Sequence, residues 1–224
     1  TEKSAKDLAE AVEADYTTNL DELSGKAGIY ICALKDDALL QLIPRLTKAN
    51  PDALWLHTAG SIPMQVWEGH AERCGVIYPL QTFSKHREVD FKQIPLFIEV
   101  NHEGDSAILD YMAHRLTDKV YRATSEQRKH LHLAAVFACN FTNHMYALAQ
   151  ELLDDYGLPF DVMLPLIDET TQKVHRLSPK QAQTGPAARG DKKVMDAHRK
   201  MLADKPQLEC IYQLLSDSIE KMKQ

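Results

Sequence analysis

The sequence predicts an α/β domain with a mostly parallel sheet, followed by an all-α domain. Over residues 1–124, short apolar runs alternate with amphipathic stretches, which is typical of βα units. Over residues 125–224, apolar residues recur at helical spacing and no strand-like run appears. We therefore expect a domain boundary between residues 124 and 125.

Each predicted strand is an apolar run of strand length. The run at 28–34 is uninterrupted, as in strands that a parallel sheet buries on both faces. Further strands are expected at 53–57, 75–78, 95–100 and, at the edge, 118–122. Helices are expected at 2–13, 36–46 and 105–116, with a short one from Pro63.

Ligands bind beyond the carboxyl ends of parallel strands. Three such segments are Lys35–Asp37, Thr58–Ser61 and Pro79–Ser84. The small and hydroxyl residues of the second segment favour close approach of a ligand and a helix N-terminus that faces a phosphate. Ser and Gly between a strand and a helix are also ordinary turn residues, so both interpretations stay open.

The segment from Pro79 to Ile94 has no clear periodicity. Loops of this length in compact domains are usually functional or disordered. Its aromatic and apolar residues, with Tyr78 before it, favour order. Residues 85–88, Lys-His-Arg-Glu, are expected to be a solvated tip.

The central stretch, 125–153, is predicted to be one long helix because it contains no Gly or Pro. Ser125 is the expected N-cap, and Gly157 with Pro159 ends the helix. Because successive residues of an α-helix are rotated by about 100°, six residues fall within one narrow arc of its circumference, termed here the stripe. The stripe comprises Lys129, His132, Val136, Asn140, Asn143 and Ala147.

Most of the remaining circumference of this helix is apolar, so we expect it to be buried, with its stripe facing a cleft or hydrogen-bonding partners. A single buried Asn or His is more often a satisfied core group than a catalytic one. Three of them, His132, Asn140 and Asn143, at a domain junction favour a cleft, because pockets form preferentially at such junctions.

The C-terminal residues predict further helices. They are expected at 158–177, with a bend at Pro165, at 192–202 and at 207–222, with a short turn after Ser178. The segment 183–191 breaks the helical pattern. Its Gln183, Thr184 and Arg189 are either polar groups that face a cleft or part of a plain interhelical turn.

Composition excludes several functional classes. A net charge of -6 and a pI near 5.9 argue against nucleic-acid and anionic-membrane surfaces. The four cysteines lack Cys-x-x-Cys spacing, which favours reduced thiols in a cytoplasmic protein, and no apolar run reaches the roughly 18 residues of a membrane span. We see no metal-ligand spacing, no nucleophile motif and no glycine-rich phosphate loop.

Several motifs together carry a resemblance to a known family. They are Ala33–Ala38 (Ala-Leu-Lys-Asp-Asp-Ala), His57–Ser61 (His-Thr-Ala-Gly-Ser), Tyr78–Phe83 (Tyr-Pro-Leu-Gln-Thr-Phe), Glu126–His144, and Gln183–Ala187 with Arg189. Over essentially its whole length, the chain resembles bacterial Rossmann-like NADP oxidoreductases with a helical C-terminal domain of unknown function. The wider superfamily is similar to 6-phosphogluconate dehydrogenase, ketopantoate reductase and pyrroline-5-carboxylate reductase.

The resemblance implies a Rossmann-like dinucleotide-binding domain at 1–124 and a helical substrate and dimerisation domain at 125–224. It implies NADP as cofactor, with NAD or a deazaflavin partner still open, and a small carbonyl, hydroxyl or imine substrate between the domains. It also implies a homodimer through the helical domain. The alternative is a dinucleotide- or metabolite-binding protein without turnover, because fold alone does not give function.

Site residues follow from the same resemblance. For the cofactor we expect Lys35, Asp36, Thr58, Gly60 and Ser61, and for the substrate Gln81, Thr82, Gln183, Thr184 and Arg189. Many relatives carry the motif Lys-x-x-x-Asn on the interdomain helix. If Asn140 is the Asn of this motif, the position of the Lys is occupied by Val136 in this sequence. His132 is then the expected proton-transfer group, with Asn140 and Asn143 beside it and no metal.

One departure concerns the cofactor fingerprint. Proteins of this family begin with a strand and a Gly-x-Gly-x-x-Ala turn that cradles the pyrophosphate. This sequence begins at Thr1, just beyond the second strand of that pattern. We expect the first βα unit to be absent from the sequence, and the chain alone to bind NADPH poorly.

Overall fold

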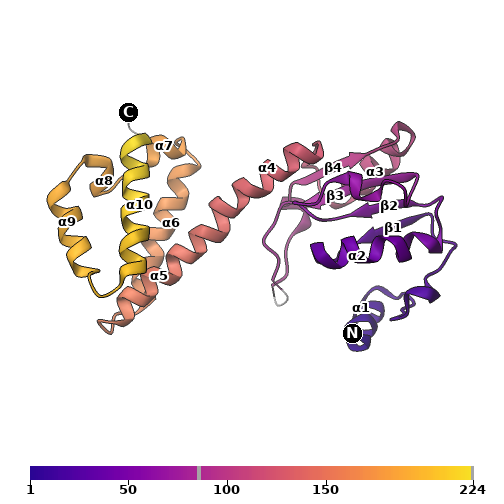
Figure 1. Ribbon diagram of the computed structural model, residues 1–224, viewed down its shortest axis with the longest axis horizontal. Helices are drawn as coiled ribbons and strands as arrows, with labels where there is room; N and C mark the ends of the chain where they lie inside the picture. Colours follow the sequence, from indigo (N-terminus) through magenta and orange to yellow (C-terminus); the bar gives the residue numbers. More distant parts are fainter. Residues whose placement is uncertain (85–86, 223–224) are drawn as a thin grey trace. The chain divides into compact units, whose positions relative to one another are not determined.

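The computed structural model describes residues 1–84 and 87–222 (Figure 1). It divides into two compact units, Thr1–Asn140, termed here the sheet unit, and Phe141–Gln224, the helical unit. The first turns of the long central helix thus belong to the sheet unit. The domain boundary predicted at 124/125 stays a prediction. The predicted solvated tip includes Lys85 and His86, which lie outside the described residues.

The sheet unit contains a five-stranded sheet in the order β1-β2-β3-β4-β5. All five predicted strands are found, at β1 Ile29–Cys32, β2 Leu54–His57, β3 Arg73–Pro79, β4 Leu96–Val100 and β5 Val120–Arg122. The pairs β1–β2, β2–β3 and β4–β5 are parallel, whereas β3–β4 is antiparallel. The mostly parallel sheet followed by helices confirms the predicted fold class.

The antiparallel pair has a local cause. Parallel neighbours need a long crossover connection, usually a helix. Between β3 and β4 the described residues form only a 3-10 turn, η4 (Phe91–Gln93), so β4 returns beside β3 with Pro79 opposite Leu96. Gly75 permits this pairing, because a Cβ there would collide with the carbonyl oxygen of Glu99.

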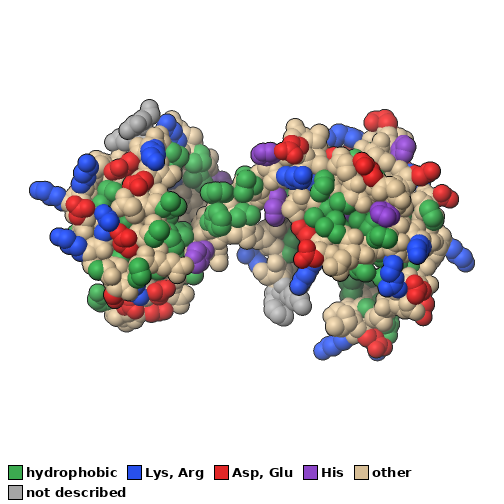
Figure 2. All heavy atoms as spheres, viewed as in Figure 1, with side chains coloured by type: hydrophobic (Ala, Val, Ile, Leu, Met, Phe, Trp, Pro, Cys, Tyr) green, Lys and Arg blue, Asp and Glu red, His purple; other side chains and the backbone are tan. Residues whose placement is uncertain are grey.

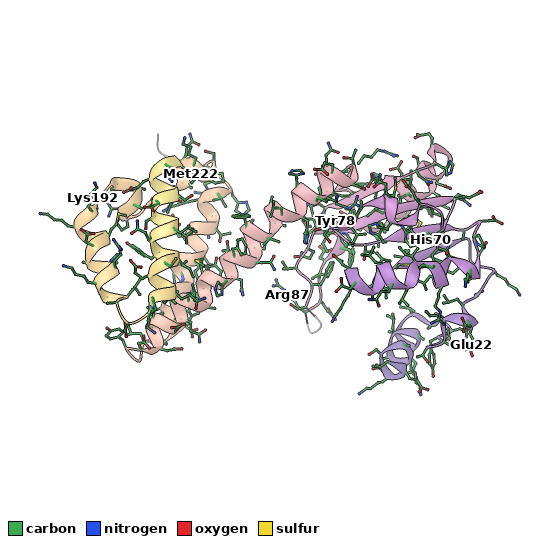
Figure 3. All side chains as sticks on the ribbon, viewed as in Figure 1. Glu22, His70, Tyr78, Arg87, Lys192 and Met222 are labelled. Atoms are coloured by element: carbon green, nitrogen blue, oxygen red, sulfur yellow. The ribbon has the colours of Figure 1, made fainter. Side chains whose placement is uncertain are left out.

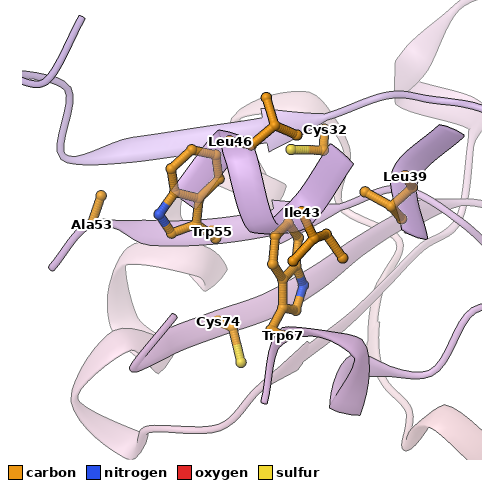
Figure 4. Packing of buried hydrophobic residues seen from close by; sticks show 8 residues of the cluster. All are labelled: Cys32, Leu39, Ile43, Leu46, Ala53, Trp55, Trp67 and Cys74. Atoms are coloured by element: carbon orange, nitrogen blue, oxygen red, sulfur yellow. The ribbon is translucent and has the colours of Figure 1, made fainter. Parts of the chain in front are cut away.

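Two hydrophobic clusters cover the two faces of the sheet. Successive side chains of a strand point to opposite faces, so Trp55 of β2 joins one cluster while Leu54 and Leu56 join the other. In the first, α2 (Asp36–Leu46) contributes Leu39, Ile43 and Leu46, and Figure 4 shows them packed with Trp55 and Trp67. In the second, α3 (Glu103–Leu116) contributes Leu109 and Ala113.

The remaining elements of the sheet unit are short. They are α1 (Glu2–Val12) and the 3-10 turns η1 (Leu20–Glu22), η2 (Thr47–Ala49) and η3 (Met64–Trp67). The helix predicted from Pro63 is therefore the 3-10 turn η3, which places the buried Trp67 against the first cluster.

The long central helix differs from its prediction in three respects. It comprises α4 (Ser125–Ala135), a π-helical segment η5 (Val136–Phe141) and α5 (Thr142–Asp154). Its N-cap is Thr124, which forms a capping box with Gln127, so Ser125 is the first helical residue. The expected burial is wrong, since Leu133 is 55% and Phe137 62% exposed, and η5 and α5 contain no buried residue.

The helical unit continues with short and medium helices. They are η6 (Phe160–Met163), α6 (Leu164–Val174), α7 (Pro179–Ala182), α8 (Pro186–Arg189), α9 (Lys192–Met201) and α10 (Pro206–Met222). The bend predicted at Pro165 is wrong, because this proline lies in the first turn of α6, where its missing N–H costs nothing. None of the described helices is long and apolar enough to cross a membrane.

Candidate functional site

A cavity of about 400 Å³ lies between the end of β3 and the helix α4–η5. All of its residues belong to the sheet unit. It is lined by Tyr78, Leu80, Gln81, Thr82, Leu131, His132, Ala134, Ala135, Ala138, Cys139 and Asn140. Four predicted site residues therefore meet at one cavity, His132 and Asn140 from the helix and Gln81 and Thr82 from the segment after β3. Their roles stay predictions.

Tyr78 and His132 form the polar contact at this cavity. The Tyr78 hydroxyl lies 3.2 Å from His132 Nδ1, and the two rings meet edge to face. Tyr78, labelled in Figure 3, is 8% exposed. Burial raises the pKa of its hydroxyl, while the positive charge of Arg128 opposes this effect. Tyr78 therefore keeps its proton at neutral pH.

Gly60 is buried against this pair. A Cβ at position 60 would lie 2.8 Å from both His132 Nδ1 and the Tyr78 ring carbon Cζ. The sequence suggests a small residue here for the approach of a ligand, but the structure provides another reason, which is the approach of two side chains. The contact thus depends on three segments, namely the loop after β2, the end of β3 and α4.

A buried ion pair holds the loop that contains Gly60. Arg128 of α4 is 1% exposed and donates to Glu99 of β4 at 2.6 Å. The same guanidinium donates to the carbonyl oxygens of Ala59 at 3.2 Å and Ile62 at 2.6 Å. A buried charge is tolerated when it is paired and hydrogen-bonded, and both conditions hold for Arg128.

Ser125 completes the network. Its backbone N–H and its hydroxyl donate to the two carboxylate oxygens of Glu99, at 2.9 and 2.8 Å. Its hydroxyl oxygen accepts from the backbone N–H of Met64 at 2.8 Å. The segment 59–64 is therefore fastened to both β4 and the start of α4.

His57, at the end of β2, does not line the cavity. Its ring is fully buried, and Nδ1 accepts a hydrogen bond from the Ala59 N–H at 3.2 Å. Burial lowers the pKa of His57 to about 4, and the charge of Arg128 acts in the same direction. The neutral ring thus carries its proton on Nε2 and is a structural group at neutral pH.

The predicted cofactor residues follow β1 and β2 at one edge of the sheet, where Cys32 pairs with His57. The Ser61 hydroxyl donates to the Asp36 carboxylate, which links the two loops. Lys35 is exposed and Thr58 half-buried. The Asp36 carboxylate suits the hydroxyl and amide donors of a dinucleotide, whereas the Lys35 ammonium suits its phosphates.

The other predicted site residues lie in the helical unit. Asn143 is exposed on α5, and Arg189 is exposed at the end of α8. The Gln183 amide donates to the carbonyl oxygen of Thr184 at 2.9 Å. Gln183 also lines a cavity of about 220 Å³ with Lys180, Ala188, Ile219 and Met222. A site shared by these residues and His132 stays a prediction.

Comparisons with known proteins assign the chain to a family. The family model described as "Domain of unknown function (DUF2520)" matches residues 94–219. None of the curated proteins compared with the chain matches it. Among solved structures, a Bacteroides fragilis protein provisionally named an NADP oxidoreductase is 59% identical, with a TM-score of 0.92 over 99% of this chain and 86% of that one.

Two more distant structures share the fold. A Thermotoga maritima protein is 21% identical, with a TM-score of 0.76 over 98% of this chain and 86% of that one. An imine reductase from Myxococcus stipitatus in complex with NADP+ is 13% identical, with a TM-score of 0.61 over 99% of this chain and 81% of that one. At such identities the likeness concerns the fold, a Rossmann-like sheet followed by helices.

Proposed function

This chain belongs to the DUF2520 family, and on that basis we propose that it is an NADP-dependent oxidoreductase. Support comes from the 59% identical protein, which is provisionally named an NADP oxidoreductase. We further propose that the substrate is a small molecule with a carbonyl, hydroxyl or imine group. A catalyst that transfers a hydride also needs a proton donor or acceptor for the oxygen or nitrogen of such a group.

The observation that carries this proposal is the cavity beside His132. Its walls are partly apolar, from Leu80, Leu131 and the alanines of the helix, and its polar groups are few. Binding sites for small molecules have this composition, because apolar walls exclude water and a few polar groups fix the orientation. His132 is the proton-transfer group of the proposal, and the amides of Asn140 and Gln81 orient the substrate.

The dinucleotide, when bound, supplies or accepts the hydride. In this proposal Lys35, Asp36, Thr58 and Ser61 hold it, with Gly60 in the same loop. Thr82 contacts the substrate from the segment after β3. Asn143, Gln183, Thr184 and Arg189, which belong to the helical unit, stay candidate substrate residues from the sequence.

We also propose a homodimer through the helical unit. Large apolar side chains on α6 and α10 are exposed, with Leu166 at 58% and Leu214 at 69%. Figure 2 shows hydrophobic side chains at the surface of this unit. Exposed apolar patches on a stable protein usually mark contacts, and most oligomers are two-fold dimers.

A reducing compartment such as the cytoplasm is part of the proposal. All four cysteines are free, with Cys32 and Cys74 buried and Cys139 and Cys210 exposed. Free thiols persist where glutathione and thioredoxin keep cysteines reduced.

The chain from Thr1 alone is expected to bind NADPH poorly, so the test uses the same protein extended upstream of Thr1 by about one βαβ unit. It measures NADPH binding by fluorescence, together with NADPH oxidation against a panel of small aldehydes, ketones and imines. The proposal expects binding and oxidation with at least one class of compound. Binding without oxidation across the panel would instead favour the non-catalytic dinucleotide-binding protein. Absence of both would contradict the cofactor assignment.

A further inference from the structure

We propose that Tyr78 is the proton donor to His132, so that the two side chains form a proton relay to the cavity. The proposal rests on the proposed reduction chemistry, but its structural part can be tested without turnover. Its first premise is the 3.2 Å contact between the Tyr78 hydroxyl and His132 Nδ1. Its second is that both side chains line the same cavity.

The direction of this hydrogen bond follows from the chemistry of the two groups. A phenol is a better donor than a neutral imidazole N–H, and an unprotonated imidazole nitrogen is a better acceptor than a phenol oxygen. Tyr78 is buried and keeps its proton. His132 Nδ1 therefore accepts, and the neutral ring carries its own proton on Nε2, the nitrogen left for a ligand in the cavity.

A second histidine on the same helix shows the opposite arrangement. His130 Nδ1 lies 2.9 Å from the backbone carbonyl oxygen of Glu126, one helical turn earlier. A carbonyl oxygen only accepts, so neutral His130 carries its proton on Nδ1. His132 Nδ1 instead faces the Tyr78 hydroxyl, and this hydrogen bond favours the Nε2–H tautomer of His132.

The relay avoids a negative charge on the His132 ring during the proposed reduction. When a hydride reaches the substrate carbon, the carbonyl oxygen becomes an alkoxide and takes a proton from His132 Nε2. Alone, the neutral ring would be left as an unstable imidazolate. If Nδ1 takes the hydroxyl proton of Tyr78 at the same time, the products are a neutral alcohol, a neutral His132 and a Tyr78 phenolate. The resting state returns when Nε2 takes a proton from solvent and Nδ1 gives its proton back to the phenolate.

The energetics favour this direction. An alkoxide is about as basic as hydroxide and therefore far more basic than the phenolate of tyrosine, whose ordinary pKa is about 10. Transfer of the proton from Tyr78 to the alkoxide is therefore favoured, and burial, which raises the pKa of Tyr78, reduces the driving force. The positive charge of Arg128 stabilises the phenolate, since it lowers the pKa of this same hydroxyl.

The fold keeps the two groups of the relay in contact. Gly60 leaves the space that both rings occupy, because a Cβ there would lie 2.8 Å from His132 Nδ1 and 2.9 Å from the Tyr78 hydroxyl oxygen. Arg128 fixes the loop on either side of Gly60 through the carbonyl oxygens of Ala59 and Ile62. Gly60 and Arg128 are therefore positioning residues, and Tyr78 is the proposed proton donor.

The structural test is the tautomer of His132, read from two-bond ¹H–¹⁵N couplings in NMR at a pH where imidazole is neutral. The variants are Tyr78→Phe and, as a matched control, Tyr111→Phe, whose ring is 67% exposed on α3. We expect almost only the Nε2–H tautomer of His132 in the wild type and in Tyr111→Phe, and a smaller fraction of this tautomer in Tyr78→Phe. His130 should remain Nδ1–H in all three proteins.

Two results would overturn the proposal. An Nδ1–H tautomer of His132 in the wild type would do so whether or not Tyr78→Phe folds. So would an unchanged kcat in a folded Tyr78→Phe protein, because the relay predicts a fall of about a hundredfold in kcat with little change in KM. If no compound is reduced at all, the tautomer measurement still decides the hydrogen bond, and only the proposed function fails.

Discussion

His57 couples the stability of the sheet unit to pH. Its folded-state pKa is about 4, below its ordinary value of 6.5, because burial disfavours the charged ring. The neutral ring therefore contributes stability in full above pH 6.5, and this contribution is lost as the pH falls toward 4. At about 1.4 kcal/mol per pKa unit, the loss is on the order of 3 kcal/mol.

The measurement is urea unfolding at pH 7.5 and pH 5 for the wild type and for His57→Leu. We expect the wild type to lose more of its free energy of unfolding between the two pH values than the variant does. Equal losses in the two proteins would show that His57 is not buried in its neutral form.

Single residues also show where sequence interpretation stops. The sequence identifies His132 and Asn140, because a polar side chain on a mostly apolar helix is conspicuous. It misses Arg128, since an arginine in the first turn of a helix normally projects into solvent. Its burial depends on Glu99, which lies 29 residues away in the chain and becomes its partner only when β4 forms.

At the scale of elements, the start of α4 sets the position of the cavity residues. Thr124 caps the helix, and its hydroxyl oxygen accepts from the Gln127 N–H at 3.2 Å. Thr124→Ala should lower the free energy of unfolding by about 1 kcal/mol, because one N–H at the helix end loses its partner. Thr124→Ser keeps the hydroxyl, so it should remain close to the wild type. Chemical denaturation of the three proteins makes the comparison, and equal losses in both variants would exclude capping as the cause.

The strands are predictable because continuous apolar runs require burial on both faces of a sheet. The direction of β4 is not predictable, since alternating elements suggest βα units. The described residues between Pro79 and Leu96 contain no crossover helix, and β4 pairs antiparallel with β3. The stripe on the central helix was calculated for a regular α-helix. A π-helical segment at Val136–Phe141 changes the number of residues per turn, so positions beyond it, such as Asn143, depart from the angle calculated for an α-helix.

At the scale of the whole molecule, the proposed homodimer predicts a change in mass. Sedimentation at micromolar concentration should show a dimer for the wild type. Leu214→Glu should shift it toward monomer, because this exposed side chain of α10 would place a charge in an apolar interface. Leu8→Glu, at a similarly exposed leucine of α1, should stay dimeric. A monomeric wild type would contradict the dimer.

The central claim is that this protein transfers a hydride between NADP and a small molecule at the cavity of His132 and Asn140. The most direct measurement is transfer of deuterium to the product from NADPH that carries two deuterium atoms at C4, followed by mass spectrometry, with the protein extended upstream of Thr1 as above. We compare the wild type with Asn140→Ala and with Asn19→Ala, a matched change at the N-cap of η1. Labelled product should form with the wild type and Asn19→Ala, and at least about tenfold more slowly with Asn140→Ala, whose exposed side chain contributes little to stability. Unlabelled product, or equal rates in all three proteins, would contradict the claim.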